Sequence, residues 1–545
     1  MTKYIFITGG VLSGLGKGTV AASIAKLLQF RGFSVSMIKC DPYLNVDAGT
    51  MNPIEHGENF VCENVWEFEP AKGFVFRIAE VDQDFGTYER FIGKNVHPSH
   101  NITSGQIYLS VILRERIGEY LGKTIQIIPH ITDEIKRRIL EIANEGSDII
   151  LVEIGGTVGD IEGMPFLEAI RQLRNSMAKE DTMLIHVTYV PYLKTIGQLK
   201  TKPTQHSVQR LLQAGLTPDA IVARCELPLT LDEKKKISLF SGVPIEAVIS
   251  APDLNVVYAL PIVFEQQGFG DYIIRRLNLI PAENPRIGLK EWEDIVKLFM
   301  MDNPSIRIAM VGKYTRIVDS YISINEALKH AGAHERVSVE ITYIDAENYE
   351  VKDLESYDGI LLTPGFGKRA TEGMIKAARF ALRKHIPFLG ICYGAQLATV
   401  AFARDVMKWK DAHTTEVNPY TSYPVVDLLP WQKNVQTKGG TMRLGGIGVF
   451  IKKGTRLWNA YKQKYVIERF RHRYHIIRDY AEKMMNEGYV INAEDEEKNI
   501  AGFEVSWHDF FLGVQFHPEF KSRPWAPSPP YREFIRAIKR KLELN

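Results

Sequence analysis

Cysteine is scarce in this 545-residue chain: Cys40, Cys62, Cys225 and Cys392 are its only four. They are widely separated and form no C-x-x-C pair, so their spacing predicts neither a zinc site nor a disulfide framework. Few, scattered cysteines are typical of a reducing compartment, and we expect a cytoplasmic protein. The sequence also lacks any apolar run approaching ~18 residues and begins on a strand pattern, so we expect neither a signal peptide nor a membrane span.

An excess of charge of one sign is missing as well. The chain has 67 Lys plus Arg against 65 Asp plus Glu, a net charge of +2. This balance predicts no binding to a nucleic acid polymer or a membrane surface, so a polyanionic ligand would need a local basic site. Internal repeats and low-complexity tracts are absent too, and a chain of this length is too long for one core.

Strand and helix patterns alternate through the first half, which predicts a mostly parallel sheet with helices on both faces. We expect strands over 4–8, 34–39, 148–153, 183–190 and 220–224, and a helix over 18–30. The alternation predicts a first domain over 1–278.

A break follows at 279–304, where Pro281, Pro285 and Pro304 bracket one helical pattern. Its apolar residues share one face, which predicts a linker helix docked on a neighbour; they are Leu289, Trp292, Ile295, Val296 and Phe299. Alternation then restarts over 305–545, with a closing helix over 531–544. The predicted fold class is α/β, with two doubly wound parallel-sheet domains.

The segment around Cys392 predicts a nucleophile. Residues 387–391 form a short buried-strand pattern, Cys392 follows, and a helical pattern begins at Ala395. A strand-to-helix turn presents a side chain in a cleft, where helix N–H groups favour a thiolate. Phe516-His517-Pro518-Glu519 adds a base and a carboxylate to orient it. A cysteine alone is more often an inert buried residue, but with His517 and Glu519 the pattern favours acyl transfer.

A glycine-rich stretch, residues 9–19, joins the first strand to the first helix and contains Lys17. Such a turn lets backbone N–H groups approach a phosphate, and the lysine adds a positive charge. It departs from G-x-x-x-x-G-K-[ST], because Val11 stands at the first glycine and Gly18 separates Lys17 from Thr19. We interpret it as a variant P-loop, in preference to a dinucleotide-binding turn or a turn that binds nothing.

Two carboxylates fit a phosphate-bound magnesium ion. Asp84 lies in a short acidic segment, and Glu153 ends a buried strand pattern just before glycines. The carboxyl ends of parallel strands are where α/β sheets bind ligands, and Mg²⁺ needs only one or two carboxylates beside phosphates and waters. With Lys17 they predict a nucleoside triphosphate site.

A basic cluster over 200–207 carries Lys200 and Lys202 among hydroxyl and amide side chains ahead of a helix. A second triphosphate would suit this composition. A solvated charged loop would have the same composition, and spacing alone leaves both interpretations open.

Together these motifs resemble the CTP synthase family over essentially the whole chain. The matching segments are 41–47, 50–53, 56–58, 152–162, 200–208, 439–445 and the Cys392 turn. The resemblance implies an ATP-dependent amidoligase domain followed by a class I glutamine amidotransferase domain. It implies that ATP phosphorylates O4 of the UTP uracil and that ammonia from glutamine displaces the phosphate to form CTP.

The resemblance also implies roles for individual residues. ATP would be bound by Gly14, Leu15, Gly16, Lys17, Gly18, Thr19, Lys39, Asp84, Pro252, Asp253 and Leu254. UTP or inhibitory CTP would be bound by Ser13, Asp160, Ile161, Glu162, Lys200, Thr201, Lys202, Pro203, Thr204, Gln205 and Lys236. Glutamine and its oxyanion would meet Gly365, Tyr393, Gly394, Ala395, Gln396, Glu416 and Arg473, with Cys392, His517 and Glu519 as the triad. Asp84 and Glu153 would hold Mg²⁺.

The same resemblance implies activation by GTP, feedback inhibition by CTP and a homotetramer, while the sequence leaves filament formation open. Three features depart from the family pattern. Pro364 stands where a glycine is expected in the oxyanion loop, His475 replaces a glutamate, and the aromatic-rich stretch 62–80 predicts a hairpin insertion near the UTP site. Two alternatives are another glutamine-dependent, ATP-using ligase and a nucleotide-sensing scaffold that has lost catalysis.

Overall fold

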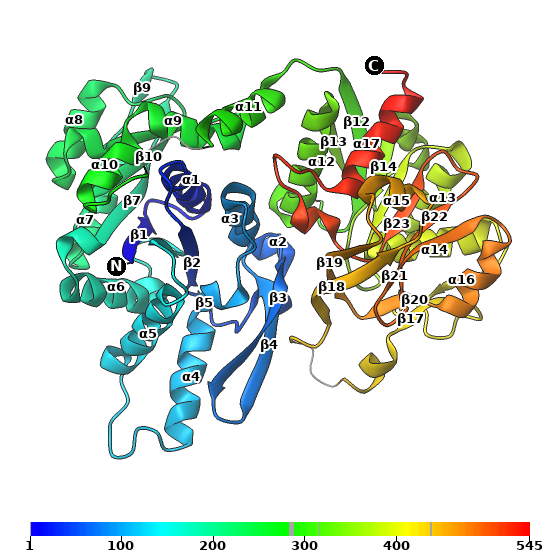
Figure 1. Cartoon of the computed structure of the whole chain (residues 1–545), viewed down its shortest axis with the longest axis horizontal. Helices are drawn as coiled ribbons and strands as arrows, with labels where there is room; N and C mark the ends of the chain where they lie inside the picture. Colours follow the sequence, from blue (N-terminus) through cyan, green and yellow to red (C-terminus); the bar gives the residue numbers. More distant parts are fainter. Residues whose placement is uncertain (1, 283–287, 316, 436–438, 545) are drawn as a thin grey trace. The chain divides into compact units, whose positions relative to one another are not determined.

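The structure is a computed structural model that describes residues 2–282, 288–315, 317–435 and 439–544. Its contacts divide the chain into two compact units, one of Met1–Ala48, Trp66–Phe76 and Asp84–Lys297, the other of Gly49–Val65, Arg77–Gln83 and Leu298–Asn545. Each unit is built on its own large sheet covered by helices, which confirms the predicted α/β class (Figure 1).

The sheet of the first unit has the order β11-β10-β7-β1-β6-β2-β5 in the described residues, and every pairing is parallel. The strands are β1 (Lys3–Gly9), β2 (Val35–Asp41), β5 (Asn101–Thr103), β6 (Ile149–Ile154), β7 (Thr182–Val190), β10 (Ala220–Cys225) and β11 (Val248–Pro252). The predicted strands are therefore confirmed to within about two residues. Because β1 lies between β6 and β7, its carboxyl end is at the switch point where α/β sheets bind ligands.

Helices cover both faces of this sheet. On one face, alternate strand residues such as Phe6 and Ile38 pack with apolar residues of α4, α5, α6 and α7. These helices span Ser104–Arg116, Thr132–Ala143, Met164–Ser176 and Lys202–Gln213. Helix α1 (Lys17–Gln29) packs with α3 (Asp84–Ile92) and α9 (Leu260–Gln266). Helices α8 (Leu231–Ser241) and α10 (Phe269–Arg276) also belong to this unit.

The helix predicted within 279–304 is α11 (Leu289–Met300). It packs through Trp292 and Val296, the two of its apolar residues that are fully buried, and the Trp292 indole N–H donates to the Tyr258 carbonyl at 2.7 Å. Pro285 lies outside the described residues. The domain boundaries at 278/279 and 304/305 stay a prediction.

The second sheet is mixed. In the described residues its order is β13-β12-β14-β15-β23-β22-β21-β18-β19, with parallel pairing up to β23 and antiparallel pairing beyond it. The parallel strands are β12 (Ser305–Gly312), β13 (Ser338–Asp345), β14 (Gly359–Leu362), β15 (Phe388–Ile391) and β23 (Phe511–Val514). The antiparallel strands are β18 (Arg443–Ile451), β19 (Tyr465–His472), β21 (Tyr489–Asp495) and β22 (Ile500–Val505).

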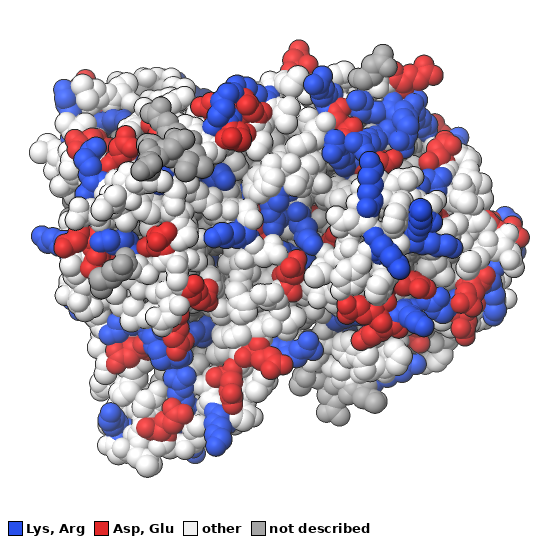
Figure 2. Space-filling model, viewed as in Figure 1, with Lys and Arg blue, Asp and Glu red and all other residues white. Residues whose placement is uncertain are grey.

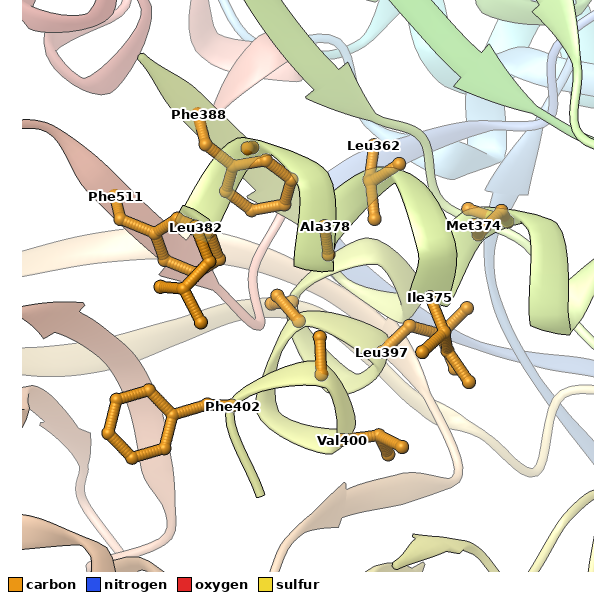
Figure 3. Packing of buried hydrophobic residues seen from close by; sticks show 14 of the residues in the cluster. Leu362, Met374, Ile375, Ala378, Leu382, Phe388, Leu397, Val400, Phe402 and Phe511 are labelled. Atoms are coloured by element: carbon orange, nitrogen blue, oxygen red, sulfur yellow. The ribbon is translucent and has the colours of Figure 1, made fainter. Parts of the chain in front are cut away.

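Two apolar layers flank this sheet. Helices α13 (Thr371–Lys384) and α14 (Tyr393–Asp405) pack against Leu362, Phe388 and Phe511 (Figure 3). On the other face, Ile308, Met310 and Leu389 pack with α12 (Ile322–Glu335) and α17 (Pro529–Lys541), the closing helix. Smaller elements are α15 (Arg456–Tyr461), α16 (Arg478–Met485) and a sheet of β16 (His413–Thr414), β17 (Pro424–Leu428) and β20 (Tyr474–Ile476).

The stretch 62–80 lies in a hairpin of β3 (Phe60–Ala71) and β4 (Phe74–Val81). In the first unit, Arg138 of α5 is 4.8 Å from the Trp66 ring centroid and 5.3 Å from that of Phe68. Segments 49–65 and 77–83 belong instead to the second unit. There the Arg469 guanidinium donates to the Val61 carbonyl at 2.8 Å, and the N–H of Ser323 donates to the buried Glu58 carboxylate.

The surface agrees with the balanced composition. Basic and acidic side chains are intermixed over much of the face that Figure 2 shows. Among the described residues, no helix has the length and apolar character needed to cross a membrane.

Candidate active sites

Cys392 occupies a sharp turn between β15 and α14. Its backbone has φ 52° and ψ −105°, outside the regions that non-glycine residues prefer, as at other strained nucleophile turns. Two positions after Cys392 the chain needs a glycine, because a Cβ on Gly394 would lie 2.4 Å from the Leu362 carbonyl oxygen. The thiol therefore sits at the N-terminus of α14, where backbone N–H groups have no partner within the helix.

His517 and Glu519 lie beside this thiol on the segment that follows β23. The His517 Nδ1 is 2.7 Å from the Glu519 Oε1, and both side chains are buried. Burial alone lowers the pKa of His517, but attraction to Glu519 and to the Cys392 thiol outweighs it and raises this pKa to about 10. Nε2 has no hydrogen-bond partner among the described residues, so it is available to exchange a proton with the thiol.

Two further groups contact the Cys392 sulfur. The Gln515 side-chain amide donates to Sγ at 3.5 Å, and the thiol donates to the Arg471 carbonyl at 3.5 Å. We did not predict Gln515 from the sequence, although it stands two positions before His517. A polar residue at the end of a buried strand, next to a proposed base, was the available signal.

The loop after β14 contains the proposed oxyanion residue Gly365. Thr363 and Pro364 precede it, and the Thr363 hydroxyl donates to the Tyr321 hydroxyl at 3.0 Å. Two residues later the Gly367 N–H donates to the Glu416 carboxylate at 2.6 Å. Burial raises the pKa of Glu416, while this hydrogen bond opposes the shift. The loop is thus tied to one of the proposed glutamine-binding residues.

The other proposed glutamine-binding residues have defined partners. The Gln396 amide donates to the Tyr474 carbonyl at 2.8 Å and to Gln515 at 3.1 Å. Arg473 donates to Gln432 at 2.7 Å and to the Thr441 hydroxyl at 3.0 Å. Tyr393, Gly394 and Ala395 form the first turn of α14 with Gln396. His475, which replaces the expected glutamate, lies opposite Asp427 in the backbone register of β17 and β20. Its Nδ1 is buried and has no hydrogen-bond partner in the described part of the chain.

In the first unit, the glycine-rich loop follows β1 at the switch point. Gly14 and Gly16 adopt positive φ values of 71° and 82°, and Val11 does so at 79°. Positive φ is costly for a β-branched residue, so the departure at Val11 places backbone strain in the loop. Lys17, the first residue of α1, is buried and donates to the Gly156 carbonyl at 2.7 Å. Burial lowers its pKa, against the attraction of Glu153.

Lys39, Asp84 and Glu153 meet at this edge of the sheet. Glu153 is in register with Lys39 on β2, and the Lys39 ammonium contacts both carboxylates, at 2.9 Å for Glu153. The Tyr88 hydroxyl, missed from the sequence, donates to Glu153 at 2.5 Å. The two carboxylates converge on a position that already attracts a cation and offer the oxygen ligands that Mg²⁺ prefers. The described residues contain no cluster of three or more metal-binding side chains, so phosphate oxygens and waters would complete the coordination.

A small apolar cleft of about 90 Å³ lies beside the loop, lined by Gly16, Thr19, Val20, Arg224, Pro252, Leu254, Val257 and Leu260. Asp253 is next to it and accepts from Arg224 at 2.8 Å. The structure thus brings the proposed ATP residues of the loop together with 252–254. Arg224, at the end of β10, is a further residue that the sequence did not single out.

A larger cleft of about 550 Å³ is lined by Val11, Thr157, Val158, Asp160, Lys202, Pro203, His206, Ser207 and Arg210. His206 belongs to the predicted basic cluster, and Arg210 extends that cluster by about one helical turn. Thr204 instead bonds Thr188 at 3.1 Å and Gln205 bonds Thr201 at 3.2 Å. Lys200, Lys236 and the exposed Ser13, Ile161 and Glu162 lie outside the lining of this cleft.

Comparison with known proteins finds a different family model in each half of the chain. Residues 3–279 match the family model described as CTP synthase N-terminus, and residues 316–537 match Glutamine amidotransferase class-I. The chain is 51% identical to the CTP synthase of Pyrococcus abyssi over 99% of this chain and 98% of that protein. It is 50% identical to that of Methanopyrus kandleri over 98% of each. The glutaminase domain of Trypanosoma brucei CTPS with bound acivicin is 34% identical, with a TM-score of 0.41, over 43% of this chain and 94% of that one.

The chain therefore combines a synthase half with a class I glutamine amidotransferase half, and it belongs to the CTP synthase family. The resemblance deduced from the motifs is confirmed.

Proposed function

We propose that this enzyme converts UTP to CTP, using ATP to activate the uracil and ammonia released from glutamine as the nitrogen donor. The observation that carries the proposal is the presence, in one chain of this family, of two strand-edge sites. One contains Cys392, His517 and Glu519, and the other contains Lys17 with Asp84 and Glu153.

Glutamine hydrolysis is assigned to the second half. His517 takes the thiol proton, Cys392 attacks the side-chain amide, and the imidazolium gives the proton to the departing ammonia. Glu519 holds the imidazole through Nδ1 at 2.7 Å. The N–H groups of Gly365 and Tyr393 stabilise the oxyanion, and Glu416, Arg473 and Gln396 bind the rest of glutamine. Water then hydrolyses the glutamyl thioester and restores the thiol.

Uracil activation is assigned to the first half. The loop Gly14–Thr19 and Lys39 bind the ATP phosphates, with Pro252, Asp253 and Leu254 beside the adenine. Asp84 and Glu153 would hold Mg²⁺, which would neutralise phosphate charge. Lys17 stabilises the charge on the transferring phosphoryl group. The phosphate goes to O4 of the uracil, ammonia adds at C4, and phosphate leaves to give CTP.

The basic cleft supports a pyrimidine nucleotide site. The UTP triphosphate is assigned to Ser13, Lys200, Lys202, Lys236 and the hydroxyl and amide groups of 201–205. The cytosine end of inhibitory CTP is assigned to Asp160, Ile161 and Glu162. The proposal includes GTP activation, a homotetramer and a cytoplasmic location. The family membership supports these regulatory and assembly properties. The Lys202, His206 and Arg210 side chains in the cleft support the nucleotide site.

The direct test is CTP formation by the purified protein from UTP, ATP, Mg²⁺ and glutamine, with each component omitted in turn. We expect CTP to form only when all the components are present. Ammonium salts should be able to take the place of glutamine. Another glutamine-dependent ligase would release ammonia without forming CTP. A nucleotide-sensing scaffold would do neither.

A further inference from the structure

Lys313 is a buried lysine, only 3% exposed, that directly follows β12 at the same sheet edge as Cys392 and His517. Its ammonium donates to the Phe366 carbonyl at 2.7 Å and also to the Gly367 carbonyl. The same nitrogen lies 4.2 Å from the ring centroid of Tyr393, the residue after the nucleophile. An ammonium has three N–H donors, so two carbonyls and one aromatic face satisfy it.

These contacts determine how the loop 364–367 presents its N–H groups. In a trans peptide the C=O and N–H point in opposite directions. Because Lys313 holds the Phe366 carbonyl, the N–H of the same peptide, that of Gly367, points away from the lysine and donates to Glu416 at 2.6 Å. The Tyr393 hydroxyl also donates to the Gly367 carbonyl, at 3.0 Å.

The stem of Lys313 reaches Gly365 itself. A Cβ built on Gly365 would lie 3.3 Å from the Lys313 Cδ, so the lysine packs directly beneath the proposed oxyanion glycine. The Arg369 guanidinium in turn donates to the Lys313 carbonyl at 2.6 Å. The lysine therefore connects β12, the loop and the first turn of α14.

A buried charge is expensive, and an apolar side chain of similar length would fill the same space at lower cost. Burial lowers the pKa of Lys313 to about 8, against the attraction of Glu416, so the ammonium form is kept near neutral pH. Its positive charge lies at the carbonyl end of the Phe366–Gly367 peptide, whose N–H end donates to Glu416, and it strengthens that N–H as a hydrogen-bond donor.

We propose that Lys313 is a positioning residue for glutamine hydrolysis, which holds the loop 364–367 so that Gly365 faces the developing oxyanion and Gly367 orients Glu416. This inference rests on the proposed amidotransferase function of the second half. It concerns a side chain that touches neither glutamine nor the thiol.

The test compares Lys313→Met and Lys313→Arg with Lys368→Met, which removes an exposed lysine of the same loop. Three rates are measured: glutamine hydrolysis, ammonia-dependent CTP formation, and alkylation of Cys392 by iodoacetamide with Cys392→Ala as the blank. Alkylation reports the thiolate and its access, and it requires no oxyanion site.

We expect Lys313→Met to lower kcat for glutamine roughly tenfold to a hundredfold, with a smaller change in KM, because oxyanion contacts act on charge that develops in the transition state. Alkylation and ammonia-dependent synthesis should stay within about twofold of the wild type, Lys313→Arg should recover part of kcat, and Lys368→Met should match the wild type.

Near-normal kcat in Lys313→Met would overturn the inference, and so would an equal loss of alkylation, since the lysine would then support the thiol or the fold. If Lys313→Met also loses ammonia-dependent synthesis, Lys313→Gln, which keeps a hydrogen-bond donor, is tested in its place. Its readout is the ratio of the glutamine hydrolysis rate to the ammonia-dependent synthesis rate. A ratio equal to that of the wild type contradicts the inference. Failure of the wild type to hydrolyse glutamine would instead refute the proposed function.

Discussion

Backbone strain marks single residues in both sites. Val11 in the glycine-rich loop and Cys392 at the head of α14 both have positive φ. Such conformations cost about 1–3 kcal/mol each and are found mainly where the surrounding structure enforces them for function. The described residues include ten non-glycine residues with positive φ, and these two lie in the segments proposed to bind phosphate and to form the thioester.

Lys17 is the side chain on which we propose that phosphoryl transfer depends most directly. Lys17→Ala should abolish CTP formation with either nitrogen source but spare glutamine hydrolysis, because the lysine acts only on the transferring phosphoryl group. Losing one such contact costs about 3 kcal/mol, roughly a hundredfold in rate. Both activities are measured beside Lys179→Ala, which removes an exposed lysine of the same unit. Near-normal synthesis in Lys17→Ala would refute the P-loop assignment.

Glu162 tests whether CTP and UTP use separate base pockets. It is an exposed residue of the short helix Ile161–Gly163 and directly follows the pair Asp160-Ile161. We expect CTP to compete with UTP, because the two ligands share triphosphate contacts, and Glu162→Ala to lose CTP inhibition more than UTP affinity. Inhibition constants and KM for UTP are compared with those of Glu180→Ala. Equal loss of both would contradict separate pockets.

Residues inside a recognisable motif could be predicted, whereas residues brought in by the fold could not. Cys392, His517 and Glu519 stand in short, distinctive segments. Lys313 reaches the same place only because β12, β14 and β15 end in register, which no local pattern shows. Arg210 likewise reaches its cleft only because α7 runs beside Gly159.

At the level of helices and strands, most of the parallel strands were predicted, although β5, β11 and β23 were not, and the antiparallel strands of the second large sheet were missed. The parallel strands are short, continuous apolar runs. Strand β18 instead contains Gly445, Gly446 and Gly448, which in a sequence favour a loop. The structure gives the reason for the last of these, since a Cβ on Gly448 would lie 2.3 Å from the Tyr465 hydroxyl of the paired strand.

The contact between α13, α14 and β16 predicts a dependence of stability on pH. Glu372 receives a hydrogen bond from His413 and pairs with Arg404 of α14 at 2.8 Å, and these partners lower its pKa from 4.5 to about 2. A lowered carboxyl pKa stabilises the fold above the unfolded value, and this stability is lost as pH falls from about 4.5 toward about 2.

We therefore expect the midpoint of thermal unfolding to fall less for Glu372→Gln than for the wild type between roughly pH 5 and pH 3. Scanning calorimetry of both proteins measures this, and Glu355→Gln, at an exposed glutamate, serves as the control. Parallel curves for Glu372→Gln and the wild type would contradict the role of this ion pair.

For the chain as a whole, its length and the alternation of strand and helix patterns predicted two α/β halves. They did not predict to which of the two units every segment belongs. Residues 49–65 and 77–83 precede most of the first half yet pack with the second. In that unit the buried Glu58 accepts from Ser323, and Glu80 accepts from Arg471 at 2.6 Å. These partners lie hundreds of positions away in the sequence, so no local pattern could reveal them.

The central claim is that one half releases ammonia and the other uses it. Cys392→Ala tests it most directly, because the thiolate is required to form the glutamyl thioester and has no part in phosphorylating UTP. CTP formation is measured for this variant with glutamine and then with ammonium salts, at saturating UTP and ATP.

We predict a loss of several orders of magnitude with glutamine and a nearly unchanged rate with ammonia. If the variant is folded and binds ATP but ammonia does not restore CTP formation, then Cys392 serves the synthetic site, and the division of labour proposed for the two halves is wrong.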